Sequence, residues 1–129
     1  MSRILIIDDD RHMRTACARI LSKDGYEVVC AESGNDGLEM IRSAAGGFNL
    51  VLLDDLMPGM SGMDVLERTK IFDPDLPVII ITGSATEEMT KELEAKGACG
   101  CLPKPFTPEQ LRNAIQKATG NGRSAVAGE

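Results

Sequence analysis

Five short apolar runs recur along the chain and constrain its fold more than any other feature. They span residues 4–7, 26–31, 50–53 and 78–81, with a weaker run at 99–102. Their apolar residues are mostly continuous rather than alternating, which indicates strands covered by side chains on both faces. Strands of that kind form parallel sheets between layers of helices, so the sequence predicts an α/β protein.

Segments whose apolar residues recur at helical spacing lie between these runs and after the last one. The expected helices are marked by Met13–Leu21, Leu38 and Ile41, Val65–Thr69, Met89–Lys96 and Leu111–Ala118. Strand and helix therefore alternate along the whole chain, which predicts a three-layer sandwich with right-handed crossovers. Residues 120–129 are small or polar and lack periodicity. We therefore expect one domain over residues 1–119, with 120–129 as a flexible tail or the start of a linker.

The charge balance excludes several classes of partner. The chain has 14 Lys and Arg against 20 Asp and Glu, a net charge of −6, and no basic tract. Direct binding to nucleic acid or to an anionic membrane surface is therefore not expected. The apolar runs are too short to span a bilayer. Because Met1-Ser2-Arg3 leads directly into a strand rather than a signal peptide, we expect a cytoplasmic location.

Ionisable and hydroxyl side chains follow the predicted strands, at the edge where open α/β sheets bind ligands. The segments are Asp8-Asp9-Asp10 after the first run, Asp54-Asp55 after the third, Thr82-Gly83-Ser84 after the fourth and Lys104-Pro105 after the fifth. No glycine-rich nucleotide-binding motif follows the first run. The candidate site therefore consists of acids, a threonine and a lysine.

Asp8, Asp9 and Asp54 converge if the first and third strands are neighbours. Two unit charges about 4 Å apart repel by roughly 4 kcal/mol at an effective dielectric of about 20. Such a cluster needs raised pKa values, a nearby lysine or a divalent cation, and Mg²⁺ suits carboxylate oxygens best. We interpret Asp10 as the cap of the first helix and Asp55 as a solvated loop carboxylate.

Four segments together resemble the receiver domain of two-component response regulators, of the chemotaxis-regulator type, over residues 3–119. They are Ile4–Asp10, Leu50–Gly62, Val78–Gly83 and Gly97–Phe106. The resemblance implies a flavodoxin-like, doubly wound fold. Its five-stranded parallel sheet would have the strand order 2-1-3-4-5, with five helices.

The resemblance also implies roles for individual residues. Asp54, four residues before Pro58, corresponds to the phosphoacceptor. Mg²⁺, or Mn²⁺ in its place, would be held by Asp8, Asp9, Asp54 and the backbone carbonyl of Leu56.

Thr82 and Lys104 correspond to the two side chains that contact the phosphoryl group. The peptide bond before Pro105 would be cis. Thr82 is also expected to act as a switch, together with Cys101, which stands where the family usually carries an aromatic residue.

The implied function is a signalling switch rather than a metabolic enzyme. The domain would accept a phosphoryl group from a sensor histidine kinase or a histidine phosphotransfer protein, and would catalyse only its own phosphorylation and dephosphorylation. Its output surface, formed by the fourth helix, fifth strand and fifth helix, would contact a downstream effector or output domain. The same face supports homodimers in some members of the family.

Two other functions remain open from the sequence. A Mg²⁺-dependent phosphohydrolase with an aspartate nucleophile would share the chemistry, but it would need an acid at the position of Leu56. A receiver-like interaction module that is never phosphorylated would normally lack one of Asp8, Asp9, Asp54 or Lys104, and all four are present.

Overall fold

A computed structural model describes residues 2–43 and 47–120 of the chain. Strands and helices alternate in the order β1 (Arg3–Ile7), α1 (Arg11–Lys23), β2 (Glu27–Ala31), α2 (Gly34–Ser43), β3 (Leu50–Asp54), α3 (Gly62–Phe72), β4 (Val78–Thr82), α4 (Glu87–Ala95), β5 (Gly100–Pro103) and α5 (Pro108–Gly120). The five strands form one sheet in the order β2-β1-β3-β4-β5, and all neighbours are parallel. The predicted fold class and strand order are therefore confirmed.

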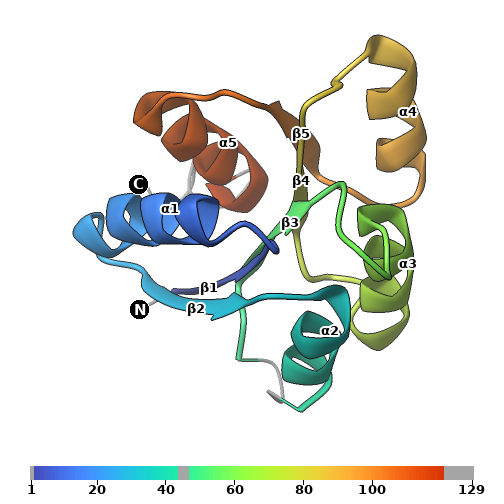
Figure 1. Ribbon diagram of the computed structural model, residues 1–129, viewed down its shortest axis with the longest axis horizontal. Helices are drawn as coiled ribbons and strands as arrows, with labels where there is room; N and C mark the ends of the chain where they lie inside the picture. The colour runs from blue at the N-terminus through green and yellow to red at the C-terminus, as the bar shows by residue number, and fades with distance from the viewer. Residues whose placement is uncertain (1, 44–46, 121–129) are drawn as a thin grey trace.

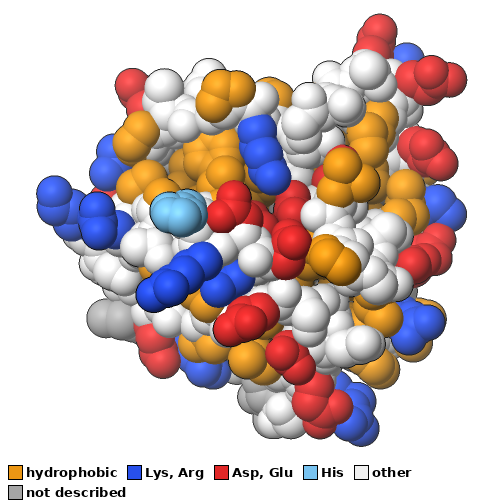
Figure 2. All heavy atoms as spheres, viewed as in Figure 1, with side chains coloured by type: hydrophobic (Ala, Val, Ile, Leu, Met, Phe, Trp, Pro, Cys, Tyr) orange, Lys and Arg blue, Asp and Glu red, His pale blue; other side chains and the backbone are white. Residues whose placement is uncertain are grey.

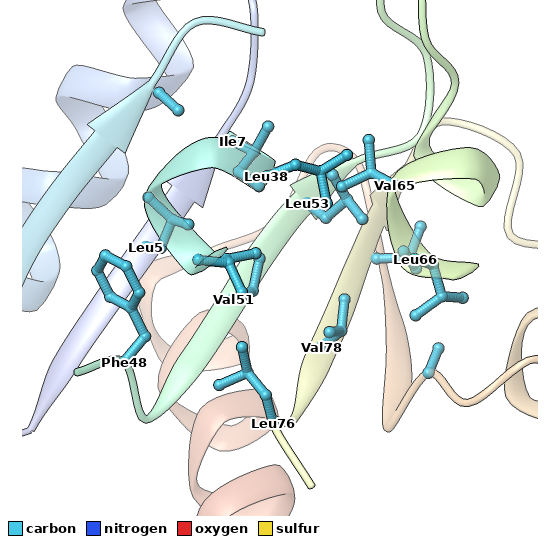
Figure 3. Packing of buried hydrophobic residues seen from close by; sticks show 14 of the residues in the cluster. Leu5, Ile7, Leu38, Phe48, Val51, Leu53, Val65, Leu66, Leu76 and Val78 are labelled. Atoms are coloured by element: carbon cyan, nitrogen blue, oxygen red, sulfur yellow. The ribbon is translucent and has the colours of Figure 1, made fainter. Parts of the chain in front are cut away.

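The helices form two layers, one on each face of the sheet. Figure 1 shows α1 and α5 together on one face, while α2, α3 and α4 lie on the other. Successive strand residues alternate between the two layers: Leu5 and Ile7 pack toward α2 and α3, and Ile4 and Ile6 pack toward α1 and α5. Figure 3 shows the cluster of buried residues that contains Leu5 and Ile7. Burial on both faces explains why the strand sequences are continuously apolar.

Side chains at the helix ends fix where the helices begin. Asp10 accepts a hydrogen bond from the backbone N–H of His12, so it caps α1 as predicted. Before α5, the Thr107 hydroxyl accepts from the N–H of Gln110, and the Gln110 side chain accepts from the N–H of Thr107. This is the capping box that satisfies two otherwise unpaired donors at the helix start.

The strand register determines which chain segments meet at the carboxyl edge of the sheet. Ile7 lies beside Leu53, so the residues that follow β1 lie beside the end of β3. Asp54 pairs with Ile81, and Thr82 pairs with Pro103. The segments that follow β1, β3, β4 and β5 therefore converge at one edge.

The C-terminal boundary differs slightly from the sequence-based expectation. Helix α5 extends through Gly120, the first residue that we assigned to a tail or linker. Residues 121–129 of that segment lie outside the described residues. Every helix within residues 2–43 and 47–120 falls short of the length and apolarity that crossing a membrane requires.

Candidate phosphoryl and metal site

Three carboxylates meet where β1 and β3 end. Asp8, Asp9 and Asp54 can each direct one oxygen to a common point, with those oxygens within 4.8 Å of one another. Asp8 and Asp54 are buried, whereas Asp9 is exposed. Figure 2 shows acidic side chains meeting basic ones near the middle of this face, above the ends of these strands. The predicted convergence of the three acids is therefore present.

Asp8 carries the clearest sign that the cluster accommodates a cation. Its Oδ1 accepts a hydrogen bond of 2.9 Å from the N–H of Asp10, but its Oδ2 is buried and has no hydrogen-bond partner among the described residues. Burial, opposed by the Asp10 hydrogen bond and augmented by the charge of Asp54, raises the pKa of Asp8 to about 6. A buried, unpaired carboxylate oxygen within a group of acids fits a hard divalent cation.

Lys104 supplies a positive charge in direct contact with Asp54. Its ammonium donates a hydrogen bond of 3.0 Å to Asp54 Oδ1. Burial lowers the pKa of Lys104, but the hydrogen bond to Asp54 and the charges of Asp54 and Asp8 outweigh this effect, so its pKa lies above the usual value. The Lys104–Pro105 peptide bond is cis, and the Lys104 N–H donates to the carbonyl of Thr82. Lys104 therefore places a cation beside the predicted phosphoacceptor.

The hydroxyl of Thr82 has an unexpected partner. It donates a hydrogen bond of 2.6 Å to Oδ2 of Asp55, and it accepts one of 3.0 Å from the N–H of Ser84. Asp55 is partly buried, so our interpretation of it as a solvated loop carboxylate was wrong. The strand order places the two residues near each other, because Asp55 follows β3 and Thr82 ends its neighbour β4, but it does not specify their hydrogen bond.

The loop after Asp54 is held in place by Gly62, the first residue of α3. The N–H of Gly62 donates to the carbonyl of Asp55 at 3.0 Å. A Cβ at this position would lie 2.6 Å from the carbonyl oxygen of Asp54. Leu56, which the sequence predicted as a metal ligand through its backbone carbonyl, lies in this loop and is 76% exposed.

Cys101 occupies β5 on the side of the sheet that faces α4. Its side chain is partly buried and packs against the apolar cluster that contains Leu93. Burial raises the pKa of the Cys101 thiol; a hydrogen bond with Thr90 opposes this rise, and the charges of Glu94 and Asp55 add to it. A thiol provides much less volume at this point than an aromatic ring.

The fold and the site together define a doubly wound domain that brings three acids, a lysine and a threonine to one strand edge. A sequence model of the family described as the response regulator receiver domain matches residues 4–116. Sporulation initiation phosphotransferase F of Bacillus subtilis is 34% identical over 115 residues, which cover 89% of this chain and 91% of that protein.

Solved structures agree with this relationship. A response regulator receiver domain protein from Clostridium thermocellum has a TM-score of 0.88 and 32% identity, covering 98% of this chain and 100% of that one. TrrA from Thermotoga maritima, a response regulator protein solved in complex with Mg²⁺ and BeF, has a TM-score of 0.80 and 30% identity, covering 92% and 99%. The chain belongs to the response regulator receiver domains of two-component signalling, whose function is phosphorylation-based switching.

Asp8→Asn is expected to stabilise the metal-free protein at about pH 7.5 by about 1–2 kcal/mol. Between the unfolded pKa of 3.8 and the folded value of about 6, the folded protein keeps a proton on Asp8 that the unfolded chain loses. The stability of the natural protein should therefore fall as pH rises through this range. An Asn side chain carries no charge, so the variant should lose this part of the pH dependence.

The measurement is urea unfolding in the presence of a chelator at about pH 4 and pH 7.5, with the exposed Asp75→Asn as the matched control. The advantage of Asp8→Asn should be small at the lower pH and larger at the higher one. A variant less stable than the natural protein at both pH values would contradict the assignment of Asp8 as a destabilising buried carboxylate.

Proposed function

We propose that Asp54 is the phosphoacceptor of this receiver domain and takes its phosphoryl group from a sensor histidine kinase or a histidine phosphotransfer protein. The observation that carries the proposal is the contact of 3.0 Å between Lys104 and the buried Asp54, beside the unpaired oxygen of Asp8. A carboxylate placed between a fixed cation and a candidate cation site can attack a phosphoryl group whose negative charge must be neutralised.

The residues present fit Mg²⁺, and Mn²⁺ would use the same oxygen ligands. Asp8, Asp9, Asp54 and the backbone carbonyl of Leu56 would hold the ion. The bound ion would supply charge neutralisation to the carboxylates and to the phosphoryl oxygens. The complex of TrrA with Mg²⁺ and BeF supports the same use of the site in this chain.

The chain's own residues account for the transfer step. An oxygen of Asp54 forms a bond to phosphorus while the bond from phosphorus to the donor imidazole nitrogen breaks, and the electron pair stays on that nitrogen. The Lys104 ammonium and the Thr82 hydroxyl then donate hydrogen bonds to the phosphoryl oxygens. In this way the domain catalyses its own phosphorylation. Attack of water on the aspartyl phosphate then forms a new bond to phosphorus and breaks the bond to the Asp54 oxygen, which releases inorganic phosphate and restores the carboxylate.

The output is a change at the surface formed by α4, β5 and α5. Movement of Thr82 toward the phosphoryl group would alter the loop after β4, and Cys101 lies on the next strand. This face would contact a downstream effector or output domain, or a second copy of the chain. We place the protein in the cytoplasm, with a receiver domain that continues to the end of α5 at Gly120 and residues 121–129 as a tail or linker.

Phosphoryl uptake can be tested with acetyl phosphate and Mg²⁺, followed by the intact mass of the protein. The natural chain should gain one phosphoryl group, because Asp54 contacts Lys104 and can direct an oxygen to the candidate metal site. Asp54→Asn should gain none, and the remote Asp75→Asn should behave like the natural chain. No gain in the natural chain would contradict the proposal and would favour a receiver-like module that is never phosphorylated.

A further inference from the structure

Asp55 and Thr82 form a hydrogen bond that competes with the proposed phosphoryl contact. An ionised carboxylate can only accept, so in the contact of 2.6 Å the threonine hydroxyl is the donor. The hydroxyl also accepts from the N–H of Ser84 at 3.0 Å. A hydroxyl has one proton, and in this arrangement Asp55 receives it. Thr82 can donate to a phosphoryl oxygen only after it leaves Asp55.

We infer that Asp55 is a positioning residue that competes with the phosphoryl group for the Thr82 hydroxyl and thereby holds the switch in its unphosphorylated arrangement. The inference rests on the proposed function of Asp54 and goes beyond it. In this role Asp55, the residue next to the acceptor, lowers the population of the arrangement in which Thr82 contacts the phosphoryl group.

The backbone of Asp55 is held by hydrogen bonds on both sides, so it cannot shift together with Thr82. Its N–H donates to the carbonyl of Ile81 at 3.0 Å, and its own carbonyl accepts from the N–H of Gly62 at the same distance. These bonds tie Asp55 to β4 and to the start of α3. Movement of Thr82 away from this position therefore lengthens the hydrogen bond, because the Asp55 backbone does not move with it.

The two groups that compete for the Thr82 hydroxyl are acceptors of similar chemistry. Both the Asp55 carboxylate and the phosphoryl group are anions, and hydrogen bonds to charged acceptors are stronger than those between neutral groups. The equilibrium between the two arrangements then depends on the difference between two similar bonds. Among the described residues the Thr82 hydroxyl donates to Asp55 and accepts from Ser84, so the contact with Asp55 restrains the hydroxyl directly.

The test uses beryllofluoride with saturating Mg²⁺ as the phosphoryl mimic and two-dimensional amide NMR of the full chain as the readout. Asp55→Ala should bind beryllofluoride about tenfold more tightly than the natural chain, since the competing acceptor is gone. In the unliganded variant, the Ser84 amide resonance should move toward its position in the beryllofluoride complex, because Thr82 then leaves Ser84 more often. Asp75→Asn, which removes a remote exposed charge, should change neither quantity.

A second pair of variants separates the hydrogen bond from simple charge repulsion. In a Thr82→Ala background, Asp55→Ala should change the beryllofluoride affinity by less than about twofold, because no hydroxyl remains to compete for. The inference is overturned if the gain in affinity is equal with and without the hydroxyl, if Asp55→Ala has no effect or weakens binding, or if the unliganded Ser84 amide does not move.

The inference and the proposed function fail in different ways. If the natural chain does not bind beryllofluoride, or if Asp54→Asn binds it equally well, the assignment of Asp54 fails and the inference fails with it. If the natural chain binds through Asp54 but Asp55→Ala behaves like the natural chain, only the role of Asp55 is wrong.

Discussion

Gly62→Ala is expected to lower the free energy of unfolding by about 2–3 kcal/mol. The added Cβ would lie 2.6 Å from the carbonyl oxygen of Asp54 and 2.9 Å from Cα of Asp55. Both atoms are backbone, so neither can rotate away as the end of a side chain could. Movement is also restricted because Gly62 itself donates to the carbonyl of Asp55. Relief of this overlap must therefore displace the backbone where β3 ends at Asp54 and the loop that follows it.

Gly83→Ala is the matched control for this substitution. A Cβ at Gly83 meets no atom within 4 Å among the described residues. Its stability in urea unfolding should stay within about 0.5 kcal/mol of the natural chain. Gly62→Ala should also weaken Mg²⁺ binding, since the displaced loop carries Leu56. Equal stability of the two alanine variants would show that the loop after β3 is not fixed by its approach to α3.

Lys104→Met is expected to slow phosphoryl uptake from acetyl phosphate by about 10- to 100-fold. The substitution keeps much of the side-chain length but removes the ammonium that donates to Asp54 Oδ1 at 3.0 Å. The phosphoryl oxygens then lose a charged donor, and the carboxylates of Asp8 and Asp54 lose the cation that offsets their mutual repulsion. Rates are measured from the time course of intact mass at fixed Mg²⁺ concentration.

Two further variants control this experiment. Lys91→Met removes a lysine whose ion pair with Glu87 is largely exposed, and it should leave the rate unchanged. Lys104→Arg restores the charge with a different geometry and should recover only part of the rate. If Lys104→Met takes up phosphoryl groups as fast as the natural chain, Lys104 has no part in the transfer step.

Much of the fold follows from one property of the sequence. Strands such as Ile4–Ile7 are apolar at every position because both faces of the sheet are covered, and this pattern alone indicates a parallel sheet. Once the strand order is set, the ends of β1 and β3 are adjacent. The convergence of Asp8, Asp9 and Asp54 then follows from the topology.

The contact of Asp55 could not be predicted in the same way. In sequence it is simply the second of two acids after a strand, and solvent is the usual surrounding of such a loop carboxylate. Its burial depends on the side-chain rotamers of Asp55, which follows β3, and of Thr82, which ends β4, and on the hydrogen bond from the Gly62 N–H to the Asp55 carbonyl. Likewise, only the packing around Asp8 shows that its Oδ2 is buried without a hydrogen-bond partner among the described residues. Patterns of residue type specify the edge of the sheet, whereas three-dimensional packing specifies the partners.

The most direct test of the central claim is to locate the phosphoryl group within the chain. After transfer from a histidine-phosphorylated donor protein in the presence of Mg²⁺, reduction with borohydride converts an aspartyl phosphate into homoserine, which peptide mass spectrometry can assign to one residue. We predict homoserine at position 54 and at no other aspartate. Homoserine at Asp55, Asp8 or Asp9, or a phosphoryl group retained on His12, would contradict the account.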